Sequence, residues 1–595
     1  MRDIRFSKVF RIGFAGLAVF FCACGSEIES EGREEHPLPE GVDVVERPPG
    51  VAGDIFTGTS AGTPATFNPL VAEDATSSDA IQRLLSGLTR FDPVKDEVVP
   101  SLAESWEISE DGRSFTFHLR RGVRWSDGEP FTADDVIFTF DAIYDERYPN
   151  RMQMEFSVGG EPFEVEKIDD YTVRITTAEI YAPFLLYIGT AILPKHKLYE
   201  AYENGTLLRA WTISTASRTP REIVGTGPFR IRSFRPAQRM IYEPNPHYWR
   251  ADQEGRRLPY VDFFIERFVQ DQNATMVAFA SGQSDHQAIT PDQVAWIRRN
   301  AELHDYTVSD RGPSTSTSFI WFNQNPGSNE NGTPFVEPHK LKWFTDQRFR
   351  QAISYGIDRQ GLIDGVIFGR GEPLWSSISP ANRQWHNPDV KQYPYDPERA
   401  RELLEAAGFE RRADGNLYDA EGNRVTFSII TNEDNRLRAN MATVFMENMK
   451  DLGIEVRLRL LDFSNFVNRI MESFNYEAGL LGFTGGRDPH GGMSIYSSGG
   501  RLHVWHPNQP EPATDWEARI DELMQMQLRT LDEDERREYF NEVQRIMSEQ
   551  MPLIYLITPN IYEGLRNRWN NIDPPNMGSL IWNLDEIWAE KRLLR

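Results

Sequence analysis

Hydrophobic and polar positions alternate over residues 224–249, VGTGPFRIRSFRPAQRMIYEPNPHYW. The alternation predicts a first strand over Phe229–Phe234, in which Ser233 shares the face of Phe229, because strand side chains repeat every second residue. A turn leads to a second predicted strand, Arg239–Glu243, which ends where prolines follow. The stretch therefore predicts a β-hairpin, and it contains no constellation of catalytic side chains.

The second half of the chain alternates between helix-like and strand-like segments. One predicted helix has strong end signals, with Asp396 as N-cap, Pro397 at its first position and Gly408 just beyond its end. A longer helix is expected over Arg348–Ile367. From residue 425 onward, short apolar strands alternate with helices, which is typical of βαβ units and a largely parallel sheet. The expected strands are Val425–Ile430, Ile454–Leu460 and Tyr476–Phe483, and the helices between them are Arg436–Leu452 and Ser464–Ser473.

Composition adds limits on size and partners. The chain has 595 residues, 39% of them hydrophobic and 12% aromatic, which is enough for two or three packed cores. Its formal net charge is −25, whereas nucleic-acid binding needs basic surface that displaces counterions. No nucleic-acid partner is therefore expected.

The N-terminus has the layout of an export signal. Four basic residues precede the apolar run Ile12–Phe21, which is ten residues long and too short to span a bilayer as a helix. Cys22 and Cys24 are the only cysteines, so no disulfide framework and no cysteine-based zinc site is expected in the folded part. The Ala-Cys junction resembles the signal of bacterial lipoproteins. This resemblance implies a signal peptide over residues 1–23 and lipid on the sulfur of Cys24.

Residues 24–50 form a predicted disordered tether. Eight acidic residues lie between positions 25 and 50, against only Arg33 and Arg47, and the rest is rich in Pro and Gly. Such a segment has too little apolar surface to offset the entropy lost on ordering. Acyl chains on Cys24 would hold an exported, acidic body at a membrane that it would not otherwise bind.

Several phrases of the sequence resemble one protein family. GTGPF followed by NPHYW, in the predicted hairpin, is similar to a hallmark of family 5 of the solute-binding proteins of bacterial ABC importers, the class that takes peptides, nickel or oligosaccharides. The run 99–144, in which Thr132 and Asp135 predict a near capping box, and the phrase AILPKHK resemble the same family. The resemblance extends over roughly residues 53–584.

The resemblance implies an α/β fold of the two-lobed, periplasmic-binding-protein-like kind (class II), with a third subdomain inserted in the first lobe. The ligand would bind between the lobes, and closure around it would present the complex to a membrane permease. The implied boundaries are residues 51–87, 193–318 and 554–595 for the first lobe, 88–192 for the inserted subdomain and 319–553 for the second lobe.

The strand predicted at Tyr476–Phe483 leads into a glycine-rich loop, TGGRDPHGG, at residues 484–492. Ligands gather at the carboxyl ends of strands in open α/β sheets, and glycines let a ligand approach the backbone. Arg487 is suited to pair with a carboxylate, and Asp488 with an amine or hydroxyl groups. We expect Arg487 and Asp488 to pair with each other while the site is empty. A flexible turn with a local ion pair is the alternative.

The resemblance also bears on the ligand. Peptide-binding members usually carry an Asp three residues after the aromatic that ends this strand, and it holds the amino group of the peptide. Here the aromatic is Phe483 and that position is Gly486. The amine anchor is thus either missing or moved to Asp488. A short peptide held by its amino group is therefore not expected; an oligosaccharide comes first and a longer peptide, gripped by backbone pairing, second. The predicted ligand contacts are Thr66, Phe67, Asn68, Trp375, Phe483, Thr484, Gly486, Arg487 and Asp488.

Three features leave alternatives open. GTSAG at residues 58–62 matches the nucleophile elbow of hydrolases, although the elbow needs a helix directly after the serine, Ser60, and Thr-Pro follows instead. His503 and His506 have the spacing of two metal ligands on a helical turn, although Pro507 argues against a helix there. The loop tryptophans, Trp375 and Trp385, are suited either to stack on a ligand or to cap the core.

We therefore predict an extracytoplasmic solute-binding protein, periplasmic or on the cell surface, without enzymatic activity, metal or cofactor. It would act as a monomer that captures a peptide or an oligosaccharide between two lobes and delivers it to an ABC transporter permease. A secreted hydrolase using Ser60, a metalloenzyme using the late histidines, and a receptor that binds a solute for signalling without transport are the competing interpretations.

Overall fold

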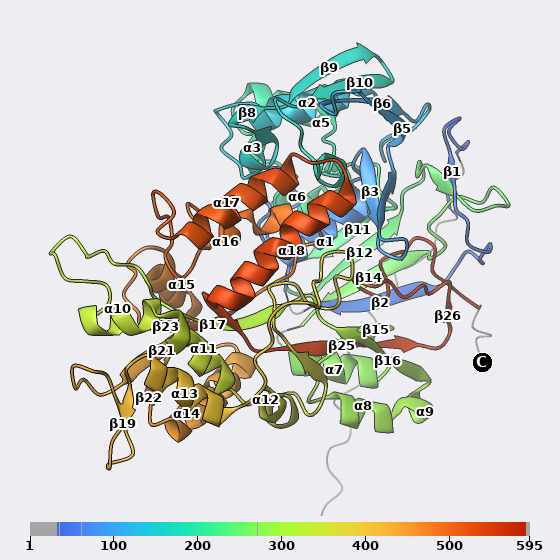
Figure 1. Cartoon of the computed structure of the whole chain (residues 1–595). Helices are drawn as coiled ribbons and strands as arrows, with labels where there is room; N and C mark the ends of the chain where they lie inside the picture. Colours follow the sequence, from blue (N-terminus) through green and yellow to red (C-terminus); the bar gives the residue numbers. More distant parts are fainter. Residues whose placement is uncertain (1–32, 35, 61, 270–271, 591–595) are drawn as a thin grey trace, which may run out of the picture.

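The computed structural model describes residues 33–34, 36–60, 62–269 and 272–590, which form two lobes side by side (Figure 1). This arrangement confirms the expected two-lobed α/β fold. The predicted signal peptide and Cys24 lie outside the described residues. Within the described residues, no helix is both long and apolar enough to cross a membrane.

The first lobe is organised around the predicted hairpin. Its strands, β11 (Phe229–Arg235) and β12 (Arg239–Pro244), pair antiparallel and continue into a four-stranded sheet in the order β11-β12-β14-β2. The expected face of Ser233 is wrong, because the register shifts between Ile231 and Ser233 and Phe234 takes the buried position. Such a bulge adds one residue and reverses the alternation beyond it. The other strands of this sheet are β14 (Phe263–Phe268) and β2 (Ile55–Ser60).

A smaller antiparallel sheet, in the order β5-β6-β10-β9, forms a separate layer at the top of Figure 1. The helix α2 (Ala133–Tyr144) packs beside β9 and starts with the predicted capping box, in which Thr132 and Asp135 each bond the backbone of the other. The strands are β5 (Ala103–Ile108), β6 (Ser114–Leu119), β9 (Glu164–Asp169) and β10 (Thr172–Thr176).

The second lobe contains a five-stranded sheet in the order β22-β21-β23-β17-β24. The strand β21 (Thr426–Asn432) runs parallel to β22 (Glu455–Leu461) and to β23 (Ala478–Phe483), as the βαβ pattern predicts, whereas β17 (Thr317–Phe322) is antiparallel to its neighbours. The connecting helices are α14 (Arg436–Asp451) and α15 (Phe463–Met471).

The helix expected over Arg348–Ile367 is two helices, α11 (Gln347–Tyr355) and α12 (Arg359–Val366). The division comes from Asp358, whose side chain accepts a hydrogen bond from Gly361 N and so caps a new helix. The predicted end signals of α13 (Pro397–Ala406) are confirmed, since Asp396 caps it and Gly408 adopts a φ of +89°.

Two backbone segments join the lobes. The strand β16 (Tyr306–Pro313) pairs with β25 (Ile557–Arg566) in a further sheet, and the chain then continues directly into β17 of the second lobe. In the return direction, β24 (Leu553–Tyr555) of the second-lobe sheet leads into β25. The domain boundaries given above stay a prediction.

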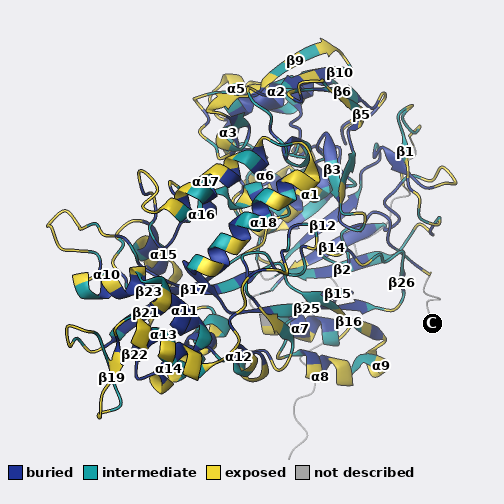
Figure 2. Ribbon diagram, in the orientation of Figure 1, coloured by how far each residue is buried: buried dark blue, intermediate teal, exposed yellow. Residues whose placement is uncertain are grey.

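Each lobe buries its own hydrophobic core, and the outer faces of the helices are exposed (Figure 2). The long helices α17 (Asp515–Leu528) and α18 (Glu533–Gln550) pack against each other and run from the second lobe toward the sheet β5-β6-β10-β9 (Figure 1). Their junction contacts that region, where Ala182 N donates to Leu528 O over 2.9 Å and Arg529 pairs with Glu179.

The predicted disorder of residues 24–50 is wrong for its second half. β1 (Asp43–Val44) pairs with β13 (Arg250–Ala251), and Arg47 donates to Glu586 and Asp573 over 2.6 and 2.8 Å. Charged side chains in this segment thus pair with the first lobe, which compensates for its lack of apolar surface. Residues 24–32 and 35 lie outside the described residues.

Candidate ligand-binding site

The strand β23 ends at Phe483, and the loop that follows lies at the edge of the second-lobe sheet. Thr484, Gly485 and Gly486 are exposed. They border a small cavity of about 50 Å³, which β17 and β24 also line. The residues around it are Thr317, Ser377, Ile378, Phe483, Thr484, Gly485, Gly486, Asp488, Pro489, Gly491, Gly492, Ile495, Tyr496, Leu553 and Tyr555.

The two glycines of this loop differ in their surroundings. A Cβ on Gly485 would lie 2.4 Å from the carbonyl oxygen of Thr315, which no side chain tolerates, so this residue allows the loop to cross the backbone of residue 315. A Cβ on Gly486 would meet only Asp488 O, at 3.5 Å, an ordinary contact. Position 486 therefore has room for a side chain that this protein lacks.

A buried asparagine holds the loop in place. Asn382 Nδ2 donates to the carbonyl oxygens of Gly486 and Arg487 over 3.0 and 3.4 Å. The ring of Phe483 packs on Phe319, with 4.8 Å between the centroids, so one part of its surface is used within the lobe. The loop is thus fixed at both ends, while the backbone from Thr484 to Gly486 stays accessible.

The expected ion pair between Arg487 and Asp488 does not form. Asp488 instead accepts from Arg536 Nη2 of α18 over 2.8 and 3.0 Å, and each side chain is only 8% exposed. Asp488 also caps the short 3₁₀ helix η4 (Pro489–Gly492) by accepting from His490 N over 2.9 Å. Its carboxylate is therefore occupied by a guanidinium and a backbone amide, and it is not a free anchor for an amine.

Arg487 points toward the first lobe. Its guanidinium carbon lies 4.0 Å from the centroid of Phe91, which belongs to β3 (Thr89–Asp92). Burial lowers the pKa of Arg487, although Asp96 opposes this. Nη1 of Arg487 is buried without a hydrogen-bond partner among the described residues. A ligand carboxylate or hydroxyl that reached this nitrogen would satisfy it.

His490 also reaches the opposite lobe. Its ring lies edge-on to Tyr181 and Tyr187, with centroid distances of 5.1 and 5.2 Å. Burial lowers the pKa of His490, although the Asp488 carboxylate acts to raise it. Among the described residues, His490 Nδ1 and Tyr181 Oη find no hydrogen-bond partner. Arg487 Nη1, His490 Nδ1 and Tyr181 Oη thus all lack a partner among the described residues on side chains that lie where the lobes meet, whereas buried polar groups in native proteins normally have partners.

Sequence reasoning missed several residues at this site. Tyr496 Oη donates to Ser377 Oγ over 2.8 Å, and both residues line the cavity beside Tyr555. Tyr496 and Ser377 stand 119 positions apart, and no periodic pattern marks either of them. Tyr555 lies on the predicted return strand, but its direction toward the cavity depends on the register of β24 against β17.

The other predicted contacts lie away from this cavity. Phe67 is fully buried and packs against Phe234, and Asn68 is 1% exposed and donates to Leu207 O over 2.8 Å, so both shape the first-lobe core. Thr66 is half-buried and accepts from Asn68 N. Trp375 stacks on the guanidinium of Arg359 at 4.5 Å. Their roles as ligand contacts stay predictions.

Of the two loop tryptophans, Trp385 caps the core. It is 2% exposed and lies in a buried cluster of the second lobe, 6.2 Å from Phe540 between centroids. Trp375 is half-buried and packs at the margin of another cluster.

The residues of the enzymatic alternatives serve structural roles. Ser60 Oγ bonds Gly62 O over 3.1 Å at the end of β2, and residues 62–66 form no helix, so the elbow geometry is absent there. His503 is fully buried between Ile495 O, at 3.0 Å, and Glu517, at 3.3 Å. Within the described residues, no three His, Cys, Asp or Glu side chains are grouped to hold a metal ion.

Comparison with known proteins agrees with the fold. The model of a family described as bacterial extracellular solute-binding proteins, family 5, matches residues 97–502. A probable ABC transporter-binding protein of Deinococcus radiodurans is 26% identical over 527 residues, which cover 84% of this chain and 86% of that protein.

Two solved structures are similar over most of their length. The oligopeptide-binding protein AppA of Bacillus subtilis, in complex with a nonapeptide, has a TM-score of 0.69 at 24% identity and covers 91% of this chain and 100% of its own. The periplasmic binding protein MelB of Agrobacterium fabrum, in complex with stachyose, has a TM-score of 0.70 at 21% identity and covers 91% of this chain and 85% of its own. At these identities the likeness establishes a shared fold.

Proposed function

Because the chain belongs to family 5 of the bacterial extracellular solute-binding proteins, we propose that it closes its two lobes around an oligosaccharide or a longer peptide and delivers it to an ABC transporter permease. The observation that carries this proposal is that Arg487 and His490, which reach the first lobe from the glycine loop, and Tyr181 opposite His490 have buried polar atoms without a partner among the described residues. A solute that contacts both lobes stabilises the closed state, because it loses half of its contacts when the lobes part. No covalent chemistry is needed.

The chemistry of the loop favours hydroxyls and carbonyls over an ammonium group. Asp488 is held by Arg536, and Gly486 supplies no carboxylate, so an amine here would be buried without a counter-ion at a cost of several kcal/mol. The Thr484 hydroxyl and the accessible backbone amides suit neutral polar groups, while Phe483 and Tyr555 offer apolar faces. AppA in complex with a nonapeptide and MelB in complex with stachyose have the same fold, so both ligand classes are compatible with it.

We further propose that the protein is exported and anchored by lipid on Cys24, and that its body is monomeric. The basic N-terminal residues, the short apolar run and the Ala-Cys junction support the anchor. Lipid would keep the binding protein near its permease at an effectively high local concentration.

Calorimetry on the purified protein tests the ligand class. We expect micromolar or tighter binding of an α- or β-linked oligosaccharide or of a peptide longer than three residues, with a smaller radius of gyration in small-angle scattering at saturation. Phe483→Ala should weaken binding about tenfold, since an aromatic contact contributes about 0.5–1.5 kcal/mol beyond its area. Phe463→Ala, which removes a half-exposed ring from α15, is the matched control.

Two outcomes would contradict the proposal. A dipeptide that binds at micromolar concentration, and loses affinity when its amine is acetylated, would refute the assignment of the loop. A bound solute that left the radius of gyration unchanged would refute closure. Mass spectrometry of small molecules released by denaturation would identify a solute that is missing from the panel.

A further inference from the structure

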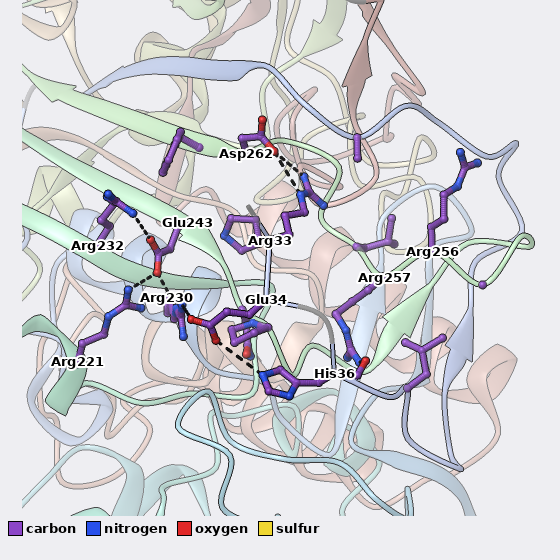
Figure 3. Close-up of a pocket in the computed structure, with 18 residues that line it drawn as sticks. Arg33, Glu34, His36, Arg221, Arg230, Arg232, Glu243, Arg256, Arg257 and Asp262 are labelled. Atoms are coloured by element: carbon purple, nitrogen blue, oxygen red, sulfur yellow. Dashed lines mark hydrogen bonds and ion pairs between the residues drawn. The ribbon is translucent and has the colours of Figure 1, made fainter. Parts of the chain in front are cut away.

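A second cavity, of about 740 Å³, lies on the first lobe, and no residue of the range 319–553 lines it (Figure 3). It opens over the hairpin strands β11 and β12, between the 3₁₀ helix η3 (Pro220–Glu222), the turn at residues 255–258 and the N-terminal segment at residues 33–38. It is therefore distinct from the loop at the end of β23. We call it the arginine groove.

The groove is basic, although the whole chain is strongly acidic. The described lining holds six arginines and three carboxylates, and Asp252 and Glu254 beside it pair with Arg256, which leaves an excess of one positive charge on a chain with a formal net charge of −25. The arginines are Arg33, Arg221, Arg230, Arg232, Arg256 and Arg257, and the acids are Glu34, Glu243 and Asp262.

One carboxylate organises three of these guanidinium groups (Figure 3). Glu243 accepts from Arg230 Nε over 2.7 Å and from Arg232 Nη1 over 3.1 Å, and it also pairs with Arg221. Burial opposes its charge, but Arg221 and Arg230 keep the pKa of Glu243 below its ordinary value. Glu243 thus holds three cations in fixed positions, and Glu34 also pairs with Arg230, so that two carboxylates of the described residues face three cations, which preorganises the site for a further anion.

Arg257 adds a positive charge that no carboxylate balances. Among the described residues, it donates to the backbone carbonyls of Tyr248, His36 and Pro37, the last two over 2.9 and 2.8 Å, and no acid lies within ion-pair distance. Burial lowers the pKa of Arg257. Arg257 is half-buried, so its cation is partly desolvated without a counter-ion, and an anionic ligand in the groove would reduce the cost of that desolvation.

The N-terminal segment brings the groove close to the predicted lipid anchor. Arg33 donates to Asp262 over 3.2 Å and to Pro259 O over 2.8 Å, and Glu34 pairs with Arg230. Arg33 stands nine positions after Cys24 in the sequence, and nine residues reach at most about 32 Å when fully extended. Lipid on Cys24 would thus keep the groove within roughly this distance of the membrane surface.

We propose that the arginine groove binds the phosphate of an anionic phospholipid headgroup in the membrane that holds the protein. Guanidinium groups bind phosphate through paired, charge-assisted hydrogen bonds, and the cavity volume lies in the range of small-molecule sites. The contact would place the first lobe against the bilayer, whereas the rest of the acidic surface is repelled by it. This inference goes beyond solute binding and does not depend on which solute the protein takes.

Vesicle co-sedimentation of the full chain carrying Cys24→Ala tests the proposal without an acyl anchor. Vesicles of phosphatidylcholine alone are compared with vesicles that contain phosphatidylglycerol, at fixed salt. Any contribution of the apolar N-terminal run is common to both, so the ratio of the two affinities isolates the anionic headgroup. We expect Arg221→Gln combined with Arg232→Gln to lower this ratio on the order of 25-fold, since each arginine near an anionic surface contributes about fivefold.

The control pair is Arg436→Gln with Arg459→Gln, which changes net charge equally at exposed positions of the second lobe. It should leave the ratio unchanged; an equal loss would mean that net charge alone acts, and would overturn the proposal. Equal binding to both vesicle types by the parent would also overturn it. Arg230 still pairs with Glu243 in the groove variant, and an unchanged unfolding midpoint verifies its fold.

Calorimetry with inorganic phosphate and glycerol 3-phosphate separates the two sources of a phosphate group. We expect dissociation constants above the millimolar range for both, because neither offers the second headgroups and the surface potential of a bilayer. Micromolar binding of glycerol 3-phosphate, lost with Arg257→Gln, would overturn the membrane assignment in favour of a soluble phosphate ester.

Discussion

The loop at the end of β23 and the arginine groove differ in how far their charged side chains are paired with opposite charges. In the loop, Asp488 and Arg536 neutralise each other in a buried pair and Arg487 lies against Phe91 of the other lobe, so the exposed residues 484–486 present backbone amides and small side chains. In the groove, Glu243 pairs with three arginines, one of which also pairs with Glu34, and Arg257 has no acidic partner among the described residues. A site whose carboxylate is already paired with a buried arginine suits neutral, hydrogen-bonding solutes, whereas a site with more cations than carboxylates suits anions.

Breaking the buried pair of Asp488 and Arg536 should have the largest effect, a loss in the free energy of unfolding. Arg536→Met leaves the Asp488 carboxylate without its counter-ion, and loss of one partner of a buried pair typically costs about 3–5 kcal/mol. Urea unfolding should show this loss. Arg537→Met, on the same helix but more exposed, should cost less than about 1 kcal/mol. Similar values for both variants would show that Asp488 does not depend on Arg536.

Adding a carboxylate at position 486 should change the ligand class. A Cβ fits there without a clash, so Gly486→Asp places an acid where the resemblance implies the amine anchor of peptide-binding members. We expect dipeptide affinity to rise about 10-fold or more, since a hydrogen bond to a charged group contributes about 1.5–3 kcal/mol. Calorimetry with a dipeptide and its acetylated form measures the gain; Gly486→Asn is the uncharged control, and an equal gain with it would contradict the charge argument.

Adding a methyl group should lower the stability of the protein at Gly485 but not at Gly486. Gly485→Ala places a methyl group 2.4 Å from Thr315 O, and overpacking of this kind costs about 1–3 kcal/mol. Gly486→Ala should be nearly neutral. Thermal unfolding of the two variants gives the comparison directly, and equal midpoints would mean that the loop moves away from Thr315 at little cost.

The smallest expected effect is a pH dependence of the docking of residues 36–50 on the first lobe beside the groove. Burial, with help from His36, Arg257, Arg124 and Arg230, lowers the pKa of His247 to about 4, and its ring stacks on His36 at 4.1 Å. The segment 36–50 docks against the neutral form of the His247 ring. Its docking should therefore be complete above pH 6.5 and weaken as the pH falls toward 4.

Hydrogen exchange of residues 36–50 at several pH values measures this docking. His247→Gln should make the exchange rates of this segment less dependent on pH. Protection that stays constant from pH 7 to pH 4 in the parent protein would contradict the assignment to His247.

The sequence predicted features whose partners stand a few residues apart. The capping box of Thr132 and Asp135, and the end signals at Asp396 and Gly408, are confirmed because each depends on hydrogen bonds and φ angles within one helical turn. The hairpin is confirmed for the same reason, but the buried and exposed positions of its first strand exchange at a β-bulge that no residue type in the sequence predicts. The family could be identified from short phrases, and the match over residues 97–502 agrees with it.

Tertiary structure decided how the charged groups pair. Adjacent Arg487 and Asp488 were expected to bond, yet Asp488 bonds Arg536, which stands 48 positions away, and Arg487 lies on Phe91 of the other lobe. Likewise, Arg47 of the expected tether pairs with Glu586, 539 positions away. Hydrophobic periodicity and caps are properties of neighbouring residues, so the sequence by itself determined the elements and the family. An arginine has many possible carboxylates, and only the packing of distant segments, which sets distance and burial, selects among them.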